Sequence, residues 1–382
     1  MKKFMAALAA FIVLVTIGGV AQAPQQKGGG DITGPYDLVA GWPQNWCGQG
    51  FQIGSTAGIW AETPDRVIVF ARGCLPVLEE PGDLVPTRNA SGYDWSQKDP
   101  ARHPRKDHIV NIVDRNGRLI ESWEQHNNLF VRPHRVLVNP YDPERHVWLV
   151  DDGAHAIFKF TRDGKTLVQT IGTRNTPGND ETHFARPTDI VWLPDGTFFV
   201  SDGYVNTRVV KFDRNGKYLT SWGMRGNPPN ETRPYYMNTV HAIVIDKKNR
   251  LYVSDRANHR VQIFDENGKF LEHWTGVPLP YSFLMTDDQY LWSASGQTSK
   301  FTKYDLNGRL LASWGTFGII PGGFWGVHQF HVDSENNLYT ADVHVGRPLK
   351  FRPKPNLSAA ERARLISAPF RAVRPVTTSS SN

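Results

Sequence analysis

The sequence predicts an all-β fold, a six-bladed β-propeller, on three observations. A hairpin motif with an Asn-Gly turn recurs along the 382 residues, a pair of apolar strands precedes each copy, and the repeats show no helical period. Repeats of about 40–55 residues that hold several short strands are typical of propeller blades. One such unit cannot bury its apolar face alone, so we expect the copies to pack side by side in a ring.

The hairpin is clearest at Ser201–Gly223, where the alternating runs Arg208–Phe212 and Lys217–Trp222 meet at Asn215-Gly216. Alternation marks half-buried strands, and Asn-Gly between them predicts a type I′ turn because that turn needs positive φ. A tryptophan follows the aspartate of each full motif by nine residues. The motifs and their tryptophans are Asp114–Arg118 with Trp123, Asp213–Lys217 with Trp222, Asp265–Lys269 with Trp274 and Asp305–Arg309 with Trp314, besides a degenerate copy at Thr161–Lys165.

Six units carry the paired apolar strands, from Ala57–Gly73 in the first to Val327–Val343 in the sixth. The sixth stops after its third strand, Pro348–Pro353, and no Trp-Gly strand follows it. An unassigned segment at the other end, Tyr36–Pro43, resembles the last strand of the other units. We therefore predict that this N-terminal strand completes blade six and closes the ring over residues 36–353, because closure pairs both open edges.

The flanks have other roles. Residues 1–23 have two lysines, an apolar stretch and Ala-Gln-Ala, which predicts a secretory signal peptide; an uncleaved anchor is the alternative. No later run is long enough to span a bilayer, so we expect a secreted or periplasmic protein. Residues 24–35 are predicted to be a flexible linker, 74–108 an inserted loop, and 354–382 a basic tail with a short helix at Ser358–Ile366.

Charge and cysteines limit the function further. The formal charge is +6, but the signal lysines and the tail account for it, and a nearly neutral body argues against nucleic-acid binding. The tail either contacts an anionic surface or stays solvated. Cys47 and Cys74 are the only cysteines and predict one disulfide in an oxidising compartment. We expect a monomer that acts on a small-molecule or peptide substrate.

Three histidines occupy one matched position on alternate blades. The aligned inner-strand residues are Ala57, His134, Thr188, His241, Ser282 and His328. Alternate blades of a six-fold ring are related by about 120°, so the three imidazoles are expected to meet near the axis. Three imidazoles with an open fourth position are a catalytic zinc arrangement. The alternative is that the histidines only fill the channel. His344, after Asp342, is expected near the same site.

Two arginines and a tyrosine follow the second strands of three blades. Arg72 and Arg256 occupy matched places on blades one and four, and Tyr204 lies one residue further along on blade three. Strand ends at the same edge of a ring face the same mouth of the channel. We therefore predict that these three side chains line a pocket above the histidines, with surface salt bridges as the alternative interpretation.

The sequence resembles a known family over most of Tyr36–Phe351. His183–Lys217, "HFARPTDIVWLPDGTFFVSDGYVNTRVVKFDRNGK", is similar to the NHL-repeat propeller of peptidyl-α-hydroxyglycine α-amidating lyase, as are "IVFARG", "RPHRV", "SDRANHR" and "ADVH". The resemblance implies an NHL-type propeller and a lyase. Such an enzyme cleaves the C–N bond of an α-hydroxy amide to give a peptide amide and glyoxylate.

The resemblance also implies roles for the residues singled out above. Zinc would be held by His134, His241 and His328. Tyr204 would be the base, and Arg72 and Arg256 would be active-site arginines. A phenol is a poor base unless nearby positive charge stabilises the phenolate. Zinc and one arginine supply such charge, while the other arginine suits a substrate carboxylate.

The sequence departs from the family at three positions. The family aspartate that binds structural calcium is Gln329 here, which argues against Ca²⁺. A family methionine is Gly326, and a family disulfide cysteine is Val205. Two rival functions remain. One is a non-enzymatic NHL propeller that binds a protein or glycan. The other is a lactonase-like zinc hydrolase, although such propellers usually rely on acidic channel ligands, which the aligned positions lack.

Overall fold

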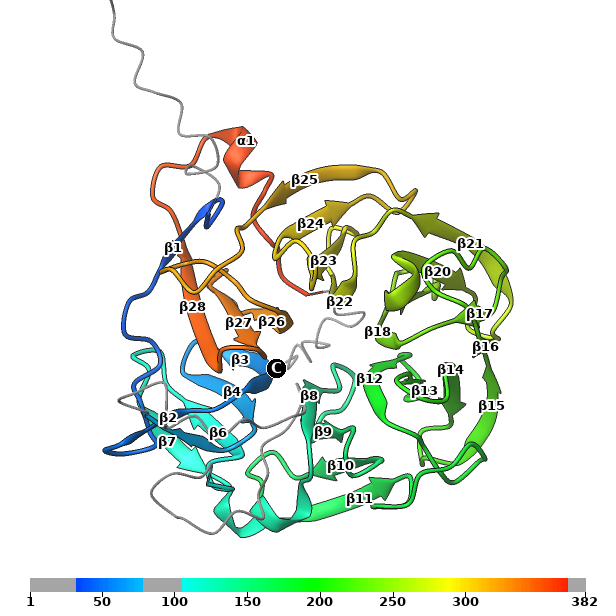
Figure 1. Cartoon of the computed structure of the whole chain (residues 1–382), viewed down its shortest axis with the longest axis horizontal. Helices are drawn as coiled ribbons and strands as arrows, with labels where there is room; N and C mark the ends of the chain where they lie inside the picture. Colours follow the sequence, from blue (N-terminus) through cyan, green and yellow to red (C-terminus); the bar gives the residue numbers. More distant parts are fainter. Residues whose placement is uncertain (1–31, 78–104, 370–382) are drawn as a thin grey trace, which may run out of the picture.

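Six four-stranded sheets form a ring around a central channel in the structure, a computed structural model that describes residues 32–77 and 105–369 (Figure 1). All neighbouring strands of these six sheets are antiparallel, and the sheets follow one another in chain order. The predicted all-β, six-bladed propeller is therefore confirmed. The predicted signal peptide and most of the predicted linker and inserted loop lie outside the described residues.

Each blade runs from an inner strand at the channel to an outer strand at the rim (Figure 1). The inner strands are β3 (Thr56–Thr63), β8 (Pro133–Val138), β12 (Pro187–Trp192), β18 (Val240–Ile245), β22 (Pro280–Met285) and β26 (Val327–Val332). The second strands are β4 (Arg66–Ala71), β9 (Val147–Asp151), β13 (Phe198–Asp202), β19 (Leu251–Asp255), β23 (Leu291–Ser295) and β27 (Leu338–Asp342). The third strands are β6 (Val110–Val113), β10 (Ala156–Phe160), β14 (Arg208–Phe212), β20 (Arg260–Phe264), β24 (Phe301–Tyr304) and β28 (Arg347–Pro353). The outer strands are β7 (Leu119–Ser122), β11 (Leu167–Ile171), β15 (Tyr218–Trp222), β21 (Phe270–Thr275), β25 (Leu310–Trp314) and β1 (Tyr36–Leu38).

The N-terminal strand closes the ring as predicted. β1 pairs with β28, with Tyr36 opposite Pro353 and Leu38 opposite Phe351. The Tyr36 side chain is fully buried, and its hydroxyl accepts a hydrogen bond from the Ile366 amide at 2.9 Å. The two ends of the propeller sequence thus share one sheet, and β1 covers the edge that β28 would otherwise leave unpaired.

The glycines of the hairpin turns are needed for two reasons, the positive φ of the turn and the close approach of the neighbouring blade. The turn before β15 has Gly216 at φ +84°, but Asn215 is not at positive φ, so the predicted type I′ turn is wrong. The Gly216 amide donates to the Asp213 carbonyl, and the pairing shifts by one residue beyond it, which is a type I turn followed by a glycine bulge. In blade four, a Cβ on Gly268 would meet the Trp222 ring of blade three at 2.7 Å, so glycine is needed for the approach as well.

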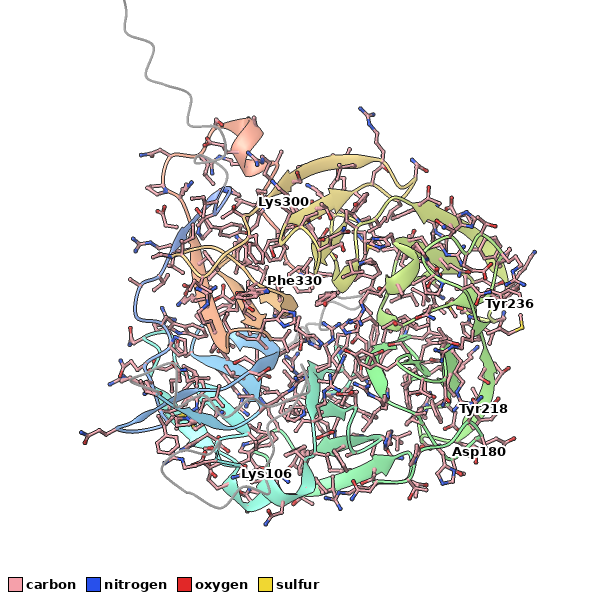
Figure 2. The ribbon with its side chains drawn as sticks, viewed as in Figure 1. Lys106, Asp180, Tyr218, Tyr236, Lys300 and Phe330 are labelled. Carbon is pink, nitrogen blue, oxygen red and sulfur yellow. A yellow bond between two sulfur atoms is a disulfide. The ribbon has the colours of Figure 1, made fainter. Side chains whose placement is uncertain are left out.

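The core consists of clusters between adjacent blades. One joins blades one and two through residues such as Phe70 and Phe158, and another joins blades six and one through Trp42 and Tyr339. Figure 2 shows side chains filling the spaces between the blades, with Phe330 near the channel and Tyr218 at the rim. A ring of such interfaces fixes each blade from both sides, which makes the channel a rigid frame for side chains.

Short elements complete the first and third blades. β2 (Phe51–Ile53) pairs with β5 (Cys74–Pro76), and the predicted disulfide joins Cys74 of β5 to Cys47. The parallel pair β16 (Met224–Arg225) and β17 (Tyr236–Met237) follows blade three. Among the described residues, the 3₁₀ helices are η3 (Glu124–Leu129) and η4 (Arg256–Asn258). No helix in residues 32–77 or 105–369 has both the length and the apolar character needed to cross a bilayer.

The described part of the tail packs on the ring instead of extending into solvent. The predicted short helix is a single turn, α1 (Ala359–Arg362), and Ser358 and Glu361 form the expected capping box. Ile366 is fully buried, and the Ala368 carbonyl accepts a hydrogen bond from the Asp287 amide of blade five at 2.9 Å. Residues 354–369 therefore pack against blades five and six, next to the place where β1 pairs with β28.

We predict that Tyr36→Ala lowers the free energy of unfolding by about 3–5 kcal/mol, the usual cost of truncating a buried aromatic side chain. Leu219→Ala, on an outer strand whose leucine is 48% exposed, should change it by less than about 0.5 kcal/mol. Urea unfolding followed by tryptophan fluorescence measures both. Equal midpoints for the parent and Tyr36→Ala would show that β1 does not stabilise the ring.

Candidate metal centre

Every inner strand has a β-bulge at its beginning. In β8 the pairing passes from Pro133–Asp151 to Arg135–Val150, so His134 is an extra residue without a partner. A bulge redirects the side chain at its centre and leaves that residue's backbone groups outside the ladder. The bulge residues, in ring order, are Ala57, His134, Thr188, His241, Tyr281 and His328.

The sequence alignment of blade five is wrong by one residue. It placed Ser282 at the position of the histidines, whereas the pairing shifts between Pro280 and Ser282 and makes Tyr281 the bulge residue. The apolar pattern of this short strand did not fix its register. The proline before the bulge could have fixed it, because Pro280 directly precedes Tyr281, as a proline precedes the bulge residue in blades two and three.

Each bulge histidine binds the bulge residue of the next blade. The contacts join His134 Nδ1 to the Thr188 carbonyl at 2.8 Å, His241 Nδ1 to the Tyr281 carbonyl at 2.6 Å and His328 Nδ1 to the Ala57 carbonyl at 2.8 Å. A carbonyl oxygen only accepts, so Nδ1 must carry the proton in all three. Each neutral ring therefore turns its Nε2 lone pair to the channel, which is the tautomer that a metal needs.

The three imidazoles converge on one point of the channel. One ligand atom from each of His134, His241 and His328 lies within 4.8 Å of the others, and all three side chains are buried. Burial, the largest cause, holds the pKa of each imidazole well below its usual range, and neighbouring positive charge acts in the same direction. His328 Nε2 is buried without a hydrogen-bond partner. Neutral, convergent donors and one orphaned nitrogen fit a bound metal ion.

Buried aspartates at the ends of the second strands hold the loops that surround this point. The Asp151 carboxylate accepts hydrogen bonds from the Val131 and Arg132 amides at 2.7 and 2.8 Å. The same contact recurs in three other blades: Asp202 to the Ala185 amide, Asp255 to the Asn238 amide and Asp342 to the Trp325 amide. These aspartates come from the "VDD", "VSD" and "TAD" motifs and fix the chain just before each bulge.

Tyr204 lies over the histidines, as the sequence predicted. It follows β13, and its hydroxyl is 2.9 Å from His241 Nε2 and 3.2 Å from His134 Nε2. A phenol carries one proton, so it donates to one of these nitrogens at most. The hydroxyl therefore sits at the open side of the three-nitrogen site, within reach of any group bound there.

The predicted arginines reach the same pocket. The Arg256 guanidinium lies 5.2 Å from the centre of the Tyr204 ring and 4.8 Å from that of Tyr281. Arg72 is 5% exposed, and its Nε donates a hydrogen bond to the Pro133 carbonyl at 3.1 Å. Burial is the main cause that lowers the pKa of His134 and His328, and the charge of Arg72 is one of the smaller causes in the same direction. The structure thus brings the two arginines to the three histidines and Tyr204.

Three further pocket residues were missed. Tyr281 faces Arg256, and burial raises its pKa. Arg186 stacks on the Tyr204 ring at 4.1 Å, and Arg132 lies 5.7 Å from the same ring. The signal was the dipeptide Arg-Pro, which occurs directly before the bulge residues of blades two and three.

The departures from the family pattern have structural consequences. A Cβ on Gly326 would overlap the His344 imidazole, so this glycine makes room for a ring at the mouth. His344 is indeed close to the site, since the charges of Arg72 and Arg256 add to burial in lowering its pKa. Val205 is 48% exposed, beside Tyr204.

Gln329 links three blades through the hydrogen bonds of its side-chain amide. Its Oε1 accepts hydrogen bonds from the Ile59 and Val136 amides, each at 3.1 Å, and its Nε2 donates to the Val136 carbonyl at 2.7 Å. The amide thus uses both its donor and acceptor atoms on the backbone of blades one and two. In residues 32–77 and 105–369, His134, His241 and His328 are the one group of three His, Cys, Asp or Glu side chains whose ligand atoms lie close enough together to hold a metal ion.

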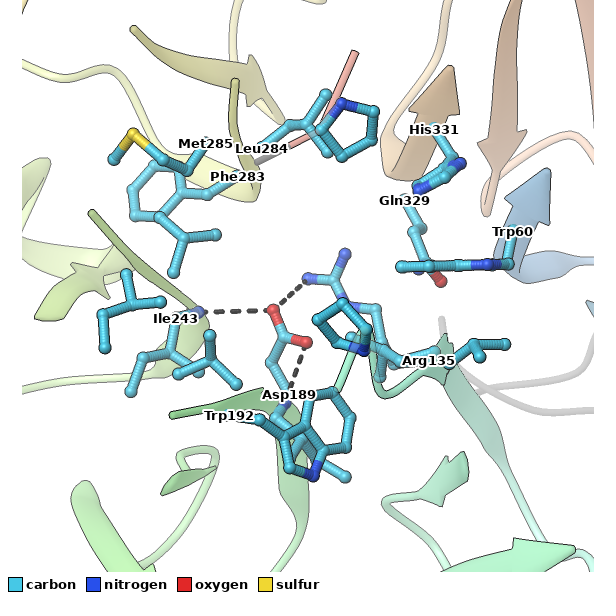
Figure 3. Close-up of a pocket in the computed structure, with 18 of the residues that line it drawn as sticks. Trp60, Arg135, Asp189, Trp192, Ile243, Phe283, Leu284, Met285, Gln329 and His331 are labelled. Atoms are coloured by element: carbon cyan, nitrogen blue, oxygen red, sulfur yellow. Dashed lines mark hydrogen bonds and ion pairs between the residues drawn. The ribbon is translucent and has the colours of Figure 1, made fainter. Parts of the chain in front are cut away.

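A cavity of about 110 Å³ lies at the end of the inner strands opposite the histidines and is lined mostly by apolar side chains (Figure 3). Between it and the histidines, Arg135 pairs with Asp189 at 3.2 Å and donates to the His328 carbonyl at 3.2 Å. Burial raises the pKa of Asp189 to about 6, and the Arg135 charge opposes this rise. This buried ion pair separates the two ends of the channel.

Comparison with known proteins supports the fold and the resemblance. A protein family described as a 6-bladed beta-propeller matches residues 177–307. Peptidyl-glycine alpha-amidating monooxygenase B of Xenopus laevis is 26% identical over 324 residues, which cover 81% of this chain and 35% of that protein. A probable peptidyl-alpha-hydroxyglycine alpha-amidating lyase of Caenorhabditis elegans is 27% identical over 233 residues, which cover 60% of this chain and 61% of that protein.

The resemblance to amidating lyases is thus confirmed, although the chain spans only about a third of the length of the first of these relatives. Among solved structures, the WD40 beta propeller domain of Doa1 superposes with a TM-score of 0.50 at 11% identity, covering 84% of this chain and 98% of that chain. At that identity the similarity concerns the fold alone.

We predict that His328→Ala abolishes metal binding, because a site that loses one of three imidazoles keeps too few ligands. The parent should hold close to one divalent metal ion per chain, and His344→Ala should retain it, since His344 is not among the convergent nitrogens. Plasma mass spectrometry of the purified proteins measures the content, with circular dichroism as the check on folding. A folded His328→Ala protein with its full complement of metal would contradict the assignment.

Proposed function

We propose that the chain is a zinc-dependent lyase that cleaves the C–N bond of an α-hydroxyglycine amide, yielding an amide and glyoxylate. The observation that carries the proposal is the Tyr204 hydroxyl, placed 2.9 and 3.2 Å from two of three convergent imidazole nitrogens. Named relatives at 26–27% identity with this lyase activity, or with the amidating activity in their names, support it.

The donor set favours zinc among divalent metals. Three neutral imidazoles with an open position are the ligand set of catalytic zinc sites. When bound, zinc acts as a Lewis acid that lowers the pKa of a substrate hydroxyl. The carbonyl partners at Nδ1 orient the three rings and make the Nε2 atoms better donors.

The chain's own residues carry out the proton transfer. Tyr204, acting as the phenolate, accepts the proton of the substrate hydroxyl, while the carbon–nitrogen bond breaks and the hydroxyl carbon becomes the aldehyde of glyoxylate. The proton is then returned to the departing amide nitrogen, so atoms and charge balance. The neighbouring guanidinium groups stabilise the phenolate at the moment when it is needed.

The arginines bind and orient the substrate. The α-carboxylate of an α-hydroxyglycine matches the planar fork of a guanidinium, which holds carboxylates in a bidentate manner. The Arg256 guanidinium lies over the Tyr204 and Tyr281 rings, beside the three histidines, where it is placed to donate to this carboxylate. The proposed setting is outside the cytoplasm, where the predicted signal peptide and the Cys47–Cys74 disulfide both belong.

We predict that Tyr204→Phe retains the metal but lowers glyoxylate release from a synthetic peptidyl-α-hydroxyglycine by about 10²–10⁴-fold, the usual contribution of a positioned acid or base. Tyr218→Phe is the matched control, because Tyr218 lies on outer strand β15. Glyoxylate is quantified by a coupled dehydrogenase assay.

Other outcomes would redirect the assignment. Metal-loaded parent protein that releases no glyoxylate would exclude this substrate class while leaving the metal site. Parent protein that never contains metal would favour the non-enzymatic binding propeller. Undiminished activity in Tyr204→Phe would remove the tyrosine from the reaction.

A further inference from the structure

The pocket holds more positive charge than one substrate carboxylate requires. Three guanidinium groups surround the Tyr204 ring, with Arg186 at 4.1 Å, Arg256 at 5.2 Å and Arg132 at 5.7 Å from its centre. Arg132 and Arg186 come from the loops directly before β8 and β12, so they lie on the side of Tyr204 that belongs to blades two and three.

A single carboxylate serves this second pair of arginines. Asp152 is fully buried, and its Oδ2 accepts hydrogen bonds from Arg186 Nε at 2.8 Å and Nη2 at 2.7 Å. Its Oδ1 lies 3.4 Å from Arg132 Nε, and neither of these two atoms has a hydrogen-bond partner. Two cations therefore share one anion, and the pair keeps one uncompensated positive charge.

Orienting Tyr204 does not account for both arginines. Arg186 is held by Asp152 and stacks on the ring, which is sufficient to position the phenol. Arg132 is too far from the ring to stack closely, and its side chain is 20% exposed. Two like charges kept side by side repel each other, and Asp152 supplies only one negative charge between them, so a second anion would lower this repulsion.

We propose that Arg132 and Arg186 form a second anion subsite, so that the substrate is an α-hydroxyglycine amide whose acyl part carries a carboxylate. This inference rests on the proposed function for the position of the first carboxylate at Arg256. The residual charge of one matches a carboxylate, whereas a phosphate group would bring a charge of about −1.5 to −2. The planar forks of two arginines suit bidentate carboxylate binding.

The test uses unreactive glycine analogues, so that it does not depend on turnover. The two analogues are N-succinylglycine and the compound in which the succinyl carboxylate is replaced by an amide. They have the same length, both keep the glycine carboxylate, and they differ only in the carboxylate of the acyl part. Isothermal titration of the metal-loaded protein should show that the acid binds about 10- to 100-fold more tightly, as expected for charge-assisted hydrogen bonds. Raising the ionic strength should reduce this preference.

Variants then locate the effect. Arg186→Gln and, separately, Arg132→Gln should each lower the affinity for the acid about 10-fold or more, while the affinity for the terminal amide changes little. Arg225→Gln, on exposed strand β16, is the control and should leave both affinities unchanged. Two variants are used because loss of Arg186 leaves the buried Asp152 carboxylate with Arg132 alone, which could destabilise the fold. Arg132→Gln keeps the hydrogen bonds between Asp152 and Arg186.

The outcomes separate this inference from the proposed function. Equal binding of the two analogues, tighter binding of the amide, or no binding of either would overturn the second subsite. A preference for the acid that survives both substitutions would place its carboxylate elsewhere and would also overturn it. Glyoxylate release from the corresponding α-hydroxyglycines is scored apart. If both α-hydroxyglycines are cleaved with equal kcat/KM, the lyase assignment stands and the second subsite is excluded. If the acid binds more tightly but neither compound is cleaved, the second subsite stands and the lyase assignment is excluded.

Discussion

The site depends on one repeated interaction, the hydrogen bond from a bulge histidine to the bulge carbonyl of the next blade. The bulge removes a carbonyl group from its ladder, and the imidazole of the preceding blade satisfies it. The same contact fixes the ring orientation and the tautomer. Because the six inner strands are packed against one another around the channel, three such contacts on alternate blades bring three Nε2 atoms to one point without further machinery.

Charge is distributed unequally along the channel. At the mouth, the Arg256 guanidinium lies against the Tyr204 and Tyr281 rings and Arg72 donates to the Pro133 carbonyl, so both arginines bring positive charge to the site. Below the histidines, Arg135 and Asp189 neutralise each other, and Gln329 joins the blades through a neutral amide. A cation bound to the histidines would therefore lie between the arginines at the mouth and this neutral layer.

Much of this arrangement could be predicted from the sequence, because the repeated blades can be aligned with one another and equivalent positions compared. The blade count, the closing strand and the three histidines follow from motifs that recur at matched places. What could not be predicted depended on single-residue register or on long-range packing. Tyr281 was missed because one residue of slip moves the bulge, and the Asn215-Gly216 turn was misassigned because only its glycine takes positive φ. The Arg135–Asp189 pair joins blades two and three, which no local pattern reports.

The central claim is that three channel imidazoles hold a catalytic zinc ion. X-ray absorption spectroscopy at the zinc edge of the purified protein tests it most directly. The account predicts a first shell with three imidazole nitrogens at about 2.0–2.1 Å and one exchangeable oxygen donor, and the loss of one imidazole contribution in any zinc retained by a histidine variant. A protein without zinc, or a shell dominated by carboxylate oxygens or sulfur, would contradict it.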